Sequence, residues 1–213
     1  MVEFMTLAEQ CAPAVHPTTM AAVVRVESSF NPYAIGVVAG RLERQPRTKA
    51  EAVATAKSLE AAGFNFSVGV GQVNRYNLAK YGLSYDSAFE PCHNLRAASL
   101  ILKECYDRAS RKGLNAQDAL QASFSCYYSG NFSTGFRPDF RGQPSYVQKV
   151  LNSAGSADRA IAVTPARAVA VKRPASPRVR PDAAFKVTEQ LERAGPVLAA
   201  GSASVEGSVM VFR

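Results

Sequence analysis

The residue type and position best suited to acid–base chemistry belong to Glu27. With Met20, Val23 and Val24 it follows the i, i+3, i+4, i+7 spacing of a helix face that packs into a core. The helix must stop before Pro32, because a residue that precedes proline disfavours the helical conformation. The carboxylate thus ends an apolar face, where loss of hydration raises a pKa toward that of a proton donor. A glutamate that turns to solvent at a fraying helix end is the alternative, and periodicity favours neither.

A glycine-rich segment at residues 69–74, Gly-Val-Gly-Gln-Val-Asn, is the second candidate. Glycines let a backbone approach a ligand closely, and Gln72 and Asn74 offer amides that can hydrogen-bond it. The segment lacks the lysine and the GxGxxG spacing of phosphate-binding loops, which excludes that class of site. On its own, the glycine pair is more typical of a tight turn.

The chain has two isolated histidines and four cysteines without a Cys-x-x-Cys pair. The cysteines are Cys11, Cys92, Cys105 and Cys126. This pattern predicts no metal site and no cofactor. The even number favours two disulfides and an oxidising compartment such as a periplasm, and four buried free thiols are the alternative.

Length and composition allow one globular enzyme domain with a further segment: the chain has 213 residues, of which 47% are hydrophobic. The net charge of +8 indicates an anionic partner such as cell wall, membrane surface or nucleic acid. The basic residues are dispersed and match no nucleic-acid-binding motif, so we expect no nucleic-acid partner. We also expect no membrane span, because no apolar run is long enough.

The first ten residues have neither the basic region nor the long apolar region of a signal peptide. Three interpretations follow: a start downstream of a signal, export by another route, or a cytoplasmic protein.

Hydrophobic spacing and capping signals predict a mainly α-helical (α+β) domain with one short strand. The expected helices span about residues 4–12, 17–27, 48–63, 95–113, 115–129 and 144–152. Alternation of apolar and polar residues predicts the strand within residues 64–70.

The character of the sequence changes near Gly155, beyond which proline, alanine, serine and arginine dominate without periodicity. We predict a folded domain at residues 1–153 and a basic, largely disordered tail at 154–213, with one weak helix near 183–193. Such a tail can serve as a linker, an interaction arm or a processed segment.

An ordered series of short motifs resembles the soluble lytic transglycosylase family, whose blocks are Glu-Ser, Gly-Leu-Met-Gln and Ala-Tyr-Asn-x-Gly. The series here is Glu27-Ser28-Ser29-Phe30-Asn31-Pro32, Gly69-Val70-Gly71-Gln72-Val73-Asn74, Pro91-Cys92-His93-Asn94-Leu95, Cys126-Tyr127-Tyr128-Ser129-Gly130-Asn131 and Tyr146-Val147. It is most similar to the small lytic transglycosylases that accompany type IV secretion systems, and the likeness covers about residues 5–152. Gly71 and Tyr128 stand where the family usually has Met and Asn, and we expect these departures to affect the lining of the substrate groove.

The resemblance implies a lysozyme-like domain with a small β element and a groove for peptidoglycan glycan strands. It implies cleavage of the MurNAc–GlcNAc β-1,4 bond by attack of the MurNAc 6-hydroxyl on its own anomeric carbon, which leaves a 1,6-anhydro end. It further implies a periplasmic enzyme that locally opens the cell wall for assembly of a type IV secretion system. Two alternatives stay open: a non-catalytic peptidoglycan-binding or assembly module, and a hydrolytic lysozyme.

One feature of the sequence agrees with the transglycosylase reaction. A hydrolysing glycosidase normally needs a second carboxylate. Between residues 28 and 85 the only acids are Glu43, Glu51 and Glu60, and the last two fall in a separately capped surface helix. A loop such as that of Glu43 could still reach over a groove.

The resemblance also implies roles for individual residues. Glu27 acts as acid and then as base, and Tyr127 hydrogen-bonds Glu27 and holds its rotamer. Contacts with the sugar or its N-acetyl group are expected of Ser28 and Gln72 and, as weaker candidates, of Asn74 and Asn94. A plain structural role is the alternative for each, and for Asn94 this is the capping of the following helix.

The resembled family often pairs a cysteine of its first helix with one near the Asn94 motif, which implies a Cys11–Cys92 disulfide. Cys105 and Cys126 then remain as a pair on consecutive helices. We expect the tail to bind other secretion components.

Overall fold

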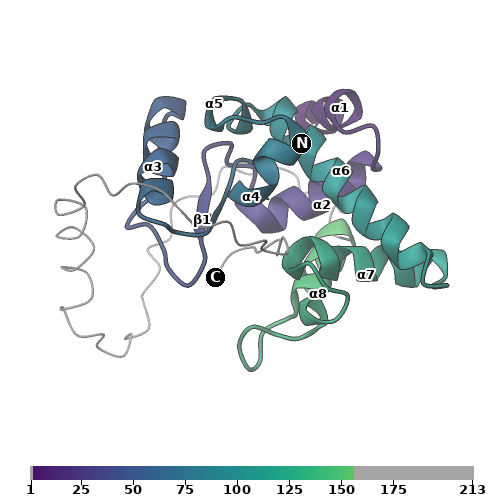
Figure 1. The fold of residues 1–213 in the computed structure, drawn as a ribbon. Coiled ribbons are helices and arrows are strands. Elements are labelled where there is room, and N and C mark those ends of the chain that lie inside the picture. The colour runs from purple at the N-terminus through teal and green to yellow at the C-terminus, as the bar shows by residue number, and fades with distance from the viewer. Residues whose placement is uncertain (1, 156–213) are drawn as a thin grey trace, which may run out of the picture. The chain divides into compact units, whose positions relative to one another are not determined.

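The computed structural model describes residues 2–155 (Figure 1). Its helices are α1 (Val2–Cys11), α2 (Pro17–Ser28), α3 (Lys49–Ala61), α4 (Arg75–Leu78), α5 (Tyr85–Ala88), α6 (Pro91–Ser110), α7 (Ala116–Ser129) and α8 (Tyr146–Gly155), with 3₁₀ turns η1 (Ala79–Tyr81) and η2 (Thr134–Phe136). Its strands are β1 (Ile35–Val37), β2 (Phe66–Val68) and β3 (Val73–Asn74). The predicted mainly α-helical fold with a small β element is confirmed. Except for the end of α8, the predicted tail and its weak helix lie outside the described residues.

Helix α2 lies in the core of the described domain. Its apolar residues Met20, Val23 and Val24 are fully buried, as the spacing predicts. They join one hydrophobic cluster with Leu95 and Ala98 of α6, and α2 itself packs against α1 and α8. The end of α2 is therefore fixed by helices from both ends of the described chain.

The three strands form a small antiparallel sheet in the order β1-β2-β3. The strand predicted within residues 64–70 is present as the shorter β2, and Phe66, Ser67 and Val68 are all buried. The side chain of Gln45 accepts from the Ile35 amide at 2.8 Å and donates to the Ile35 carbonyl at 3.0 Å. A side-chain amide thus satisfies backbone groups of β1 on its unpaired side.

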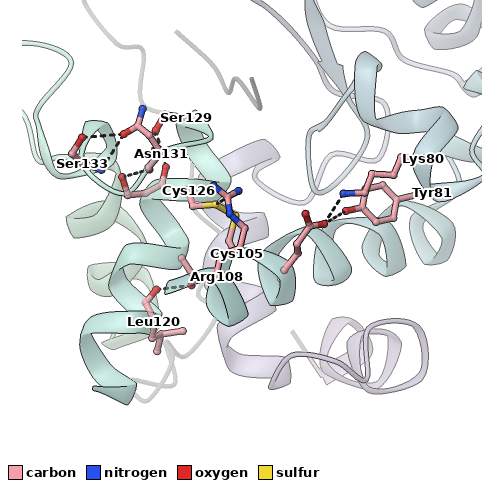
Figure 2. The surroundings of a disulfide bond; sticks show 12 residues. Lys80, Tyr81, Cys105, Arg108, Leu120, Cys126, Ser129, Asn131 and Ser133 are labelled. Atoms are coloured by element: carbon pink, nitrogen blue, oxygen red, sulfur yellow. Dashed lines mark hydrogen bonds and ion pairs between the residues drawn. A yellow bond between two sulfur atoms is a disulfide. The ribbon is translucent and has the colours of Figure 1, made fainter. Parts of the chain in front are cut away.

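Two disulfides connect helices, and both pairings implied by the family resemblance are confirmed. Cys11–Cys92 joins the end of α1 to the beginning of α6. Cys105–Cys126 joins α6 to α7, and Figure 2 shows the Arg108 guanidinium directed at the sulfur of Cys126. Both bonds attach neighbours to α6, the longest helix of the described domain.

Candidate active site

Glu27 lies one residue before the end of α2, and only 3% of its surface is exposed. Pro17 supplies the first residue of this helix, where its missing N–H costs no hydrogen bond. At the other end the Ser29 amide donates to the Arg25 carbonyl at 3.2 Å and closes the last turn. The predicted position of Glu27 at the end of a buried apolar face is therefore correct, and the alternative of a solvent-exposed glutamate is wrong.

The backbone directly after α2 adopts an uncommon conformation. Ser29 and Phe30 have φ angles of 52° and 65°, in the left-handed region that non-glycine residues rarely occupy. Phe30 packs edge-on against Phe4 of α1, with ring centroids 4.9 Å apart, and the Arg25 guanidinium lies 5.3 Å from its centroid. These contacts stabilise a turn that ends the helix right after Glu27.

The two carboxyl oxygens of Glu27 have different surroundings. Tyr146, the first residue of α8, donates its hydroxyl to Oε1. Oε2 is buried and has no hydrogen-bond partner in the part of the chain that the structure describes. Burial raises the Glu27 pKa from 4.5 to about 8, because it disfavours the charged form more than the Tyr146 hydrogen bond favours it. At neutral pH Glu27 thus carries a proton and has one oxygen free to donate it.

Tyr127 does not make the hydrogen bond that the resemblance implies. Its hydroxyl donates to the carbonyl of Gly71, and the phenol on Glu27 belongs to Tyr146. Tyr127 still lies close enough for the charge of Glu27 to raise its pKa, after the larger effect of burial. The sequence offers a signal for Tyr146, since this residue lies in the last predicted helix and belongs to the motif series, but nothing in the sequence identifies Glu27 as its partner.

The side chain of Asn94 makes three hydrogen bonds, which connect the end of β2 and the loop that follows it to the end of α5. Its Oδ1 accepts from the Gly71 amide at 2.7 Å, while its Nδ2 donates to the carbonyls of Val68 at 2.9 Å and Ala88 at 2.7 Å. Asn94 is fully buried inside α6 and does not cap it, because the helix begins at Pro91. The Asn94 side chain therefore holds the backbone of Gly71, whose carbonyl accepts the hydrogen bond from Tyr127.

The other amides and the hydroxyl predicted to contact substrate also bind protein groups. Ser28 donates to the Val70 carbonyl at 2.7 Å, which connects the end of α2 to the same loop. Gln72 is fully buried, donates to the Ala34 carbonyl at 3.0 Å and leaves its Oε1 without a partner within the described residues. Asn74 caps α4, since its Oδ1 accepts from the Tyr76 amide at 3.1 Å.

Both departures from the family motifs lie in the interior of the described domain, and the expectation that they affect the groove lining stays a prediction. A Cβ on Gly71 would lie 2.6 Å from the Ala98 Cβ, which leaves no room for a side chain. Tyr128 is 7% exposed, and its ring stacks on Tyr146 with centroids 4.6 Å apart. The departure at Tyr128 therefore contacts Tyr146, which hydrogen-bonds Glu27. The departure at Gly71 lies at the carbonyl that accepts from Tyr127.

Two of the three acids between residues 28 and 85 are engaged in ion pairs. Glu51 and Glu60 lie on α3, as predicted, where they pair with Arg44 and Arg75, respectively. Within residues 2–155 no group of three or more His, Cys, Asp or Glu side chains could hold a metal ion. In the same range no helix combines the length and the apolarity needed to cross a membrane.

Comparisons with known proteins find similarity over most of the chain. The family model described as the transglycosylase SLT domain matches residues 4–133. The chain is 54% identical to the "Type IV secretion system protein virB1" of Brucella suis biovar 1 (strain 1330), over 92% of this chain and 78% of that protein. It is 32% identical to the "Protein virB1" of Agrobacterium fabrum (strain C58 / ATCC 33970), over 71% of this chain and 59% of that protein. No solved structure matches the chain.

Proposed function

Because the chain belongs to the transglycosylase SLT domain family, we propose that it is a peptidoglycan lytic transglycosylase with Glu27 as its single acid and base. The proposal rests on the burial, the raised pKa and the hydrogen bonding of the Glu27 side chain. Glu27 is buried, its pKa is raised to about 8, and one of its oxygens is held while the other has no partner among the described residues. A carboxyl group that keeps its proton at neutral pH can transfer it to a glycosidic oxygen.

The proposed reaction uses the carboxyl group of Glu27 twice, first as an acid and then as a base. Glu27 first donates its proton from Oε2 to the glycosidic oxygen while the bond from this oxygen to the MurNAc anomeric carbon breaks. The Glu27 carboxylate then takes the proton of the MurNAc 6-hydroxyl as the oxygen of that group bonds to the anomeric carbon, which forms a 1,6-anhydro end. Glu27 returns to its protonated form and no water is consumed. The Tyr146 hydrogen bond, which lowers the Glu27 pKa, stabilises the carboxylate between the two steps.

The contacts of Ser28, Gln72, Asn74 and Asn94 with substrate stay predictions. Each side chain now binds protein groups, so a contact with sugar requires it to share or leave its present partner. For the three amide side chains, which are fully buried, this also requires the protein around them to move. Their present bonds support a role in holding the loop that Tyr127 contacts.

We further propose that the enzyme acts in the periplasm, where it opens the cell wall for a type IV secretion system. The Brucella relatives, whose printed name includes that system, support this setting. Two disulfides support an oxidising compartment, and the net charge of +8 suits an anionic wall. Association of residues 154–213 with other secretion components stays a prediction.

Digestion of purified sacculi, with analysis of the released fragments by mass spectrometry, tests the proposal. We expect wild-type protein to release fragments. Glu27→Gln should lower the rate of digestion by roughly 10²–10⁴-fold or more, because a single residue serves both steps. The exposed Glu43 provides a matched control, and Glu43→Gln should digest like wild type. Activity retained by Glu27→Gln would disprove the assignment. Wild-type protein that binds sacculi without releasing fragments would instead support the binding-module alternative.

A further inference from the structure

The phenol that holds Glu27 comes from a distant part of the chain and needs support of its own. Tyr146 opens α8, 119 residues after Glu27. Its ring is buried and stacks on Tyr128 of α7, with an angle of 18° between the ring planes. Such a stack restricts how the Tyr146 ring can tilt, and hence where its hydroxyl lies.

Tyr128 is itself fastened to the segment that leads into α8. Its hydroxyl donates to Asp139 Oδ1 at 2.6 Å, and the Asp139 side chain is only 14% exposed. The other oxygen of Asp139 lies 3.7 Å from the ammonium of Lys149, which belongs to α8, as Tyr146 does. A continuous series of contacts therefore runs from Lys149 through Asp139, Tyr128 and Tyr146 to Glu27.

We propose that Tyr128 and Asp139 are positioning residues, which fix the ring of Tyr146 so that its hydroxyl stays on Glu27 Oε1. This inference rests on the proposed function, because it concerns how Glu27 is held for the same reaction. It also gives the tyrosine at position 128 a purpose: an asparagine side chain has no ring to stack on Tyr146. Misplacement of a catalytic group by about 1 Å can cost about 10²-fold in rate, so a support of this kind has kinetic consequences.

Variants can separate the ring from its hydrogen bond. Tyr128→Phe keeps the stacked ring but loses the bond to Asp139, and Asp139→Ala removes the same bond from the other side. Asp139→Asn keeps an oxygen that can accept from Tyr128, so it is the conservative variant. We expect Tyr128→Phe and Asp139→Ala each to lower kcat by about tenfold with KM unchanged, and Asp139→Asn to retain most of the activity. The double variant Tyr128→Phe/Asp139→Ala should be no slower than Asp139→Ala alone, because Asp139→Ala already removes the bond that Tyr128→Phe removes.

The pH profile of kcat gives a readout that a general loss of stability would not change. The titratable group that acts on the Glu27 pKa is Tyr146 of α8, and the charge of Glu27 in turn raises the pKa of Tyr127 of α7. Tyr128→Phe and Asp139→Ala loosen the Tyr146 hydrogen bond, which favours the charged form, so the fall in kcat at alkaline pH should move to higher pH. Tyr85, which stacks on Phe66 with centroids 5.9 Å apart, offers a matched control in Tyr85→Phe, and this variant should leave kcat and its pH profile unchanged.

Several results would overturn the positioning role. A raised KM with an unchanged kcat would make Tyr128 a substrate contact. An Asp139→Asn variant as slow as Asp139→Ala would assign the effect to the charge of Asp139, and multiplied losses in the double variant would show two independent roles. Full activity of Tyr128→Phe in an enzyme that Glu27→Gln inactivates would refute this inference alone. Activity retained by Glu27→Gln would refute the proposed function itself.

Discussion

The catalytic assignment depends on two opposing effects on one carboxyl group. Burial among apolar residues disfavours the Glu27 carboxylate, whereas the hydroxyl of Tyr146 stabilises it. The effect of burial is larger, so Glu27 is protonated before the reaction. The hydrogen bond from Tyr146 stabilises the carboxylate that acts as the base when the 6-hydroxyl attacks. A glycosidase with a single carboxylate needs both properties in the same residue.

The pH dependence of cleavage follows from this balance. The first step requires protonated Glu27, so we expect kcat to be constant below a pKa of about 8 and to fall as the pH rises through it. Tyr146→Phe removes the hydrogen bond that lowers the pKa, so it should slow the reaction and move the alkaline fall to higher pH. The 55% exposed Tyr76 provides a control in Tyr76→Phe, which should leave the profile unchanged. A fall that moves to lower pH in Tyr146→Phe would contradict the role given to this hydroxyl.

The absence of a side chain at Gly71 should matter for stability. In Gly71→Ala the new methyl group overlaps Ala98, so we expect the free energy of unfolding to drop by about 1–3 kcal/mol. The overlap should also displace the Gly71 carbonyl, which accepts the hydrogen bond from Tyr127. Gly40→Ala is the control, because its Cβ would meet no atom closer than 3.4 Å. Chemical denaturation of both variants measures the difference, and equal stability would show that the loop adapts at no cost.

At the scale of elements, the sequence predicts the long helices, which local patterns define. It misses most of the short strands and helices, which show no such pattern. The helices of ten residues or more follow from repeated apolar spacing and from caps such as Thr48, whose side chain accepts from the Glu51 amide. Strands β1 and β3 have three and two residues, and α4 and α5 four each, so none is long enough to show a period. The strands also depend on hydrogen bonds with other segments, as Ile35 of β1 makes with Gln45.

The candidate site shows the same division. Glu27 could be found because its helix has a periodic face, and the order of the motifs supports it. The partner of Glu27 could not, because the choice between Tyr127 and Tyr146 depends on how α7 and α8 pack against α2. Amide side chains such as Asn94 are equally suited to bind a sugar or a buried backbone group, so residue type does not distinguish these roles.

The two disulfides should contribute unequally to the free energy of unfolding. Cys11–Cys92 closes a span of 81 residues and Cys105–Cys126 one of 21. Loop entropy alone predicts losses of about 4 and about 3 kcal/mol when each pair is changed to alanine, so the first double variant should be the less stable. Denaturation with and without reductant measures this, since reductant should then affect only the remaining bond. A larger loss from the Cys105/Cys126 pair would show that packing at that bond outweighs chain entropy.

At the scale of the whole molecule, we predict a division of labour between the folded domain and residues 154–213. Every residue given a role in catalysis lies before Gly155, the last residue of α8. The following sequence carries Arg167, Lys172, Arg173, Arg178 and Arg180 among prolines, a composition that exposes charge. A variant that ends at Gly155 should digest sacculi at the wild-type rate but fail to restore secretion to a strain that lacks the protein.

Two outcomes would contradict that division. Normal secretion with the shortened variant would leave residues 156–213 without the predicted role. Loss of digestion would show that the catalytic domain extends beyond Gly155.

The central claim is that Glu27 directs a hydroxyl of the substrate, rather than water, to the anomeric carbon. Digestion of sacculi in water labelled with oxygen-18 tests it most directly, with mass spectrometry of the new chain ends. An internal attack predicts ends that carry no label and are lighter by one water than ordinary reducing ends. Ends with one labelled oxygen, formed in wild-type protein and lost in Glu27→Gln, would show that the enzyme is a hydrolytic lysozyme and that the proposed reaction is wrong.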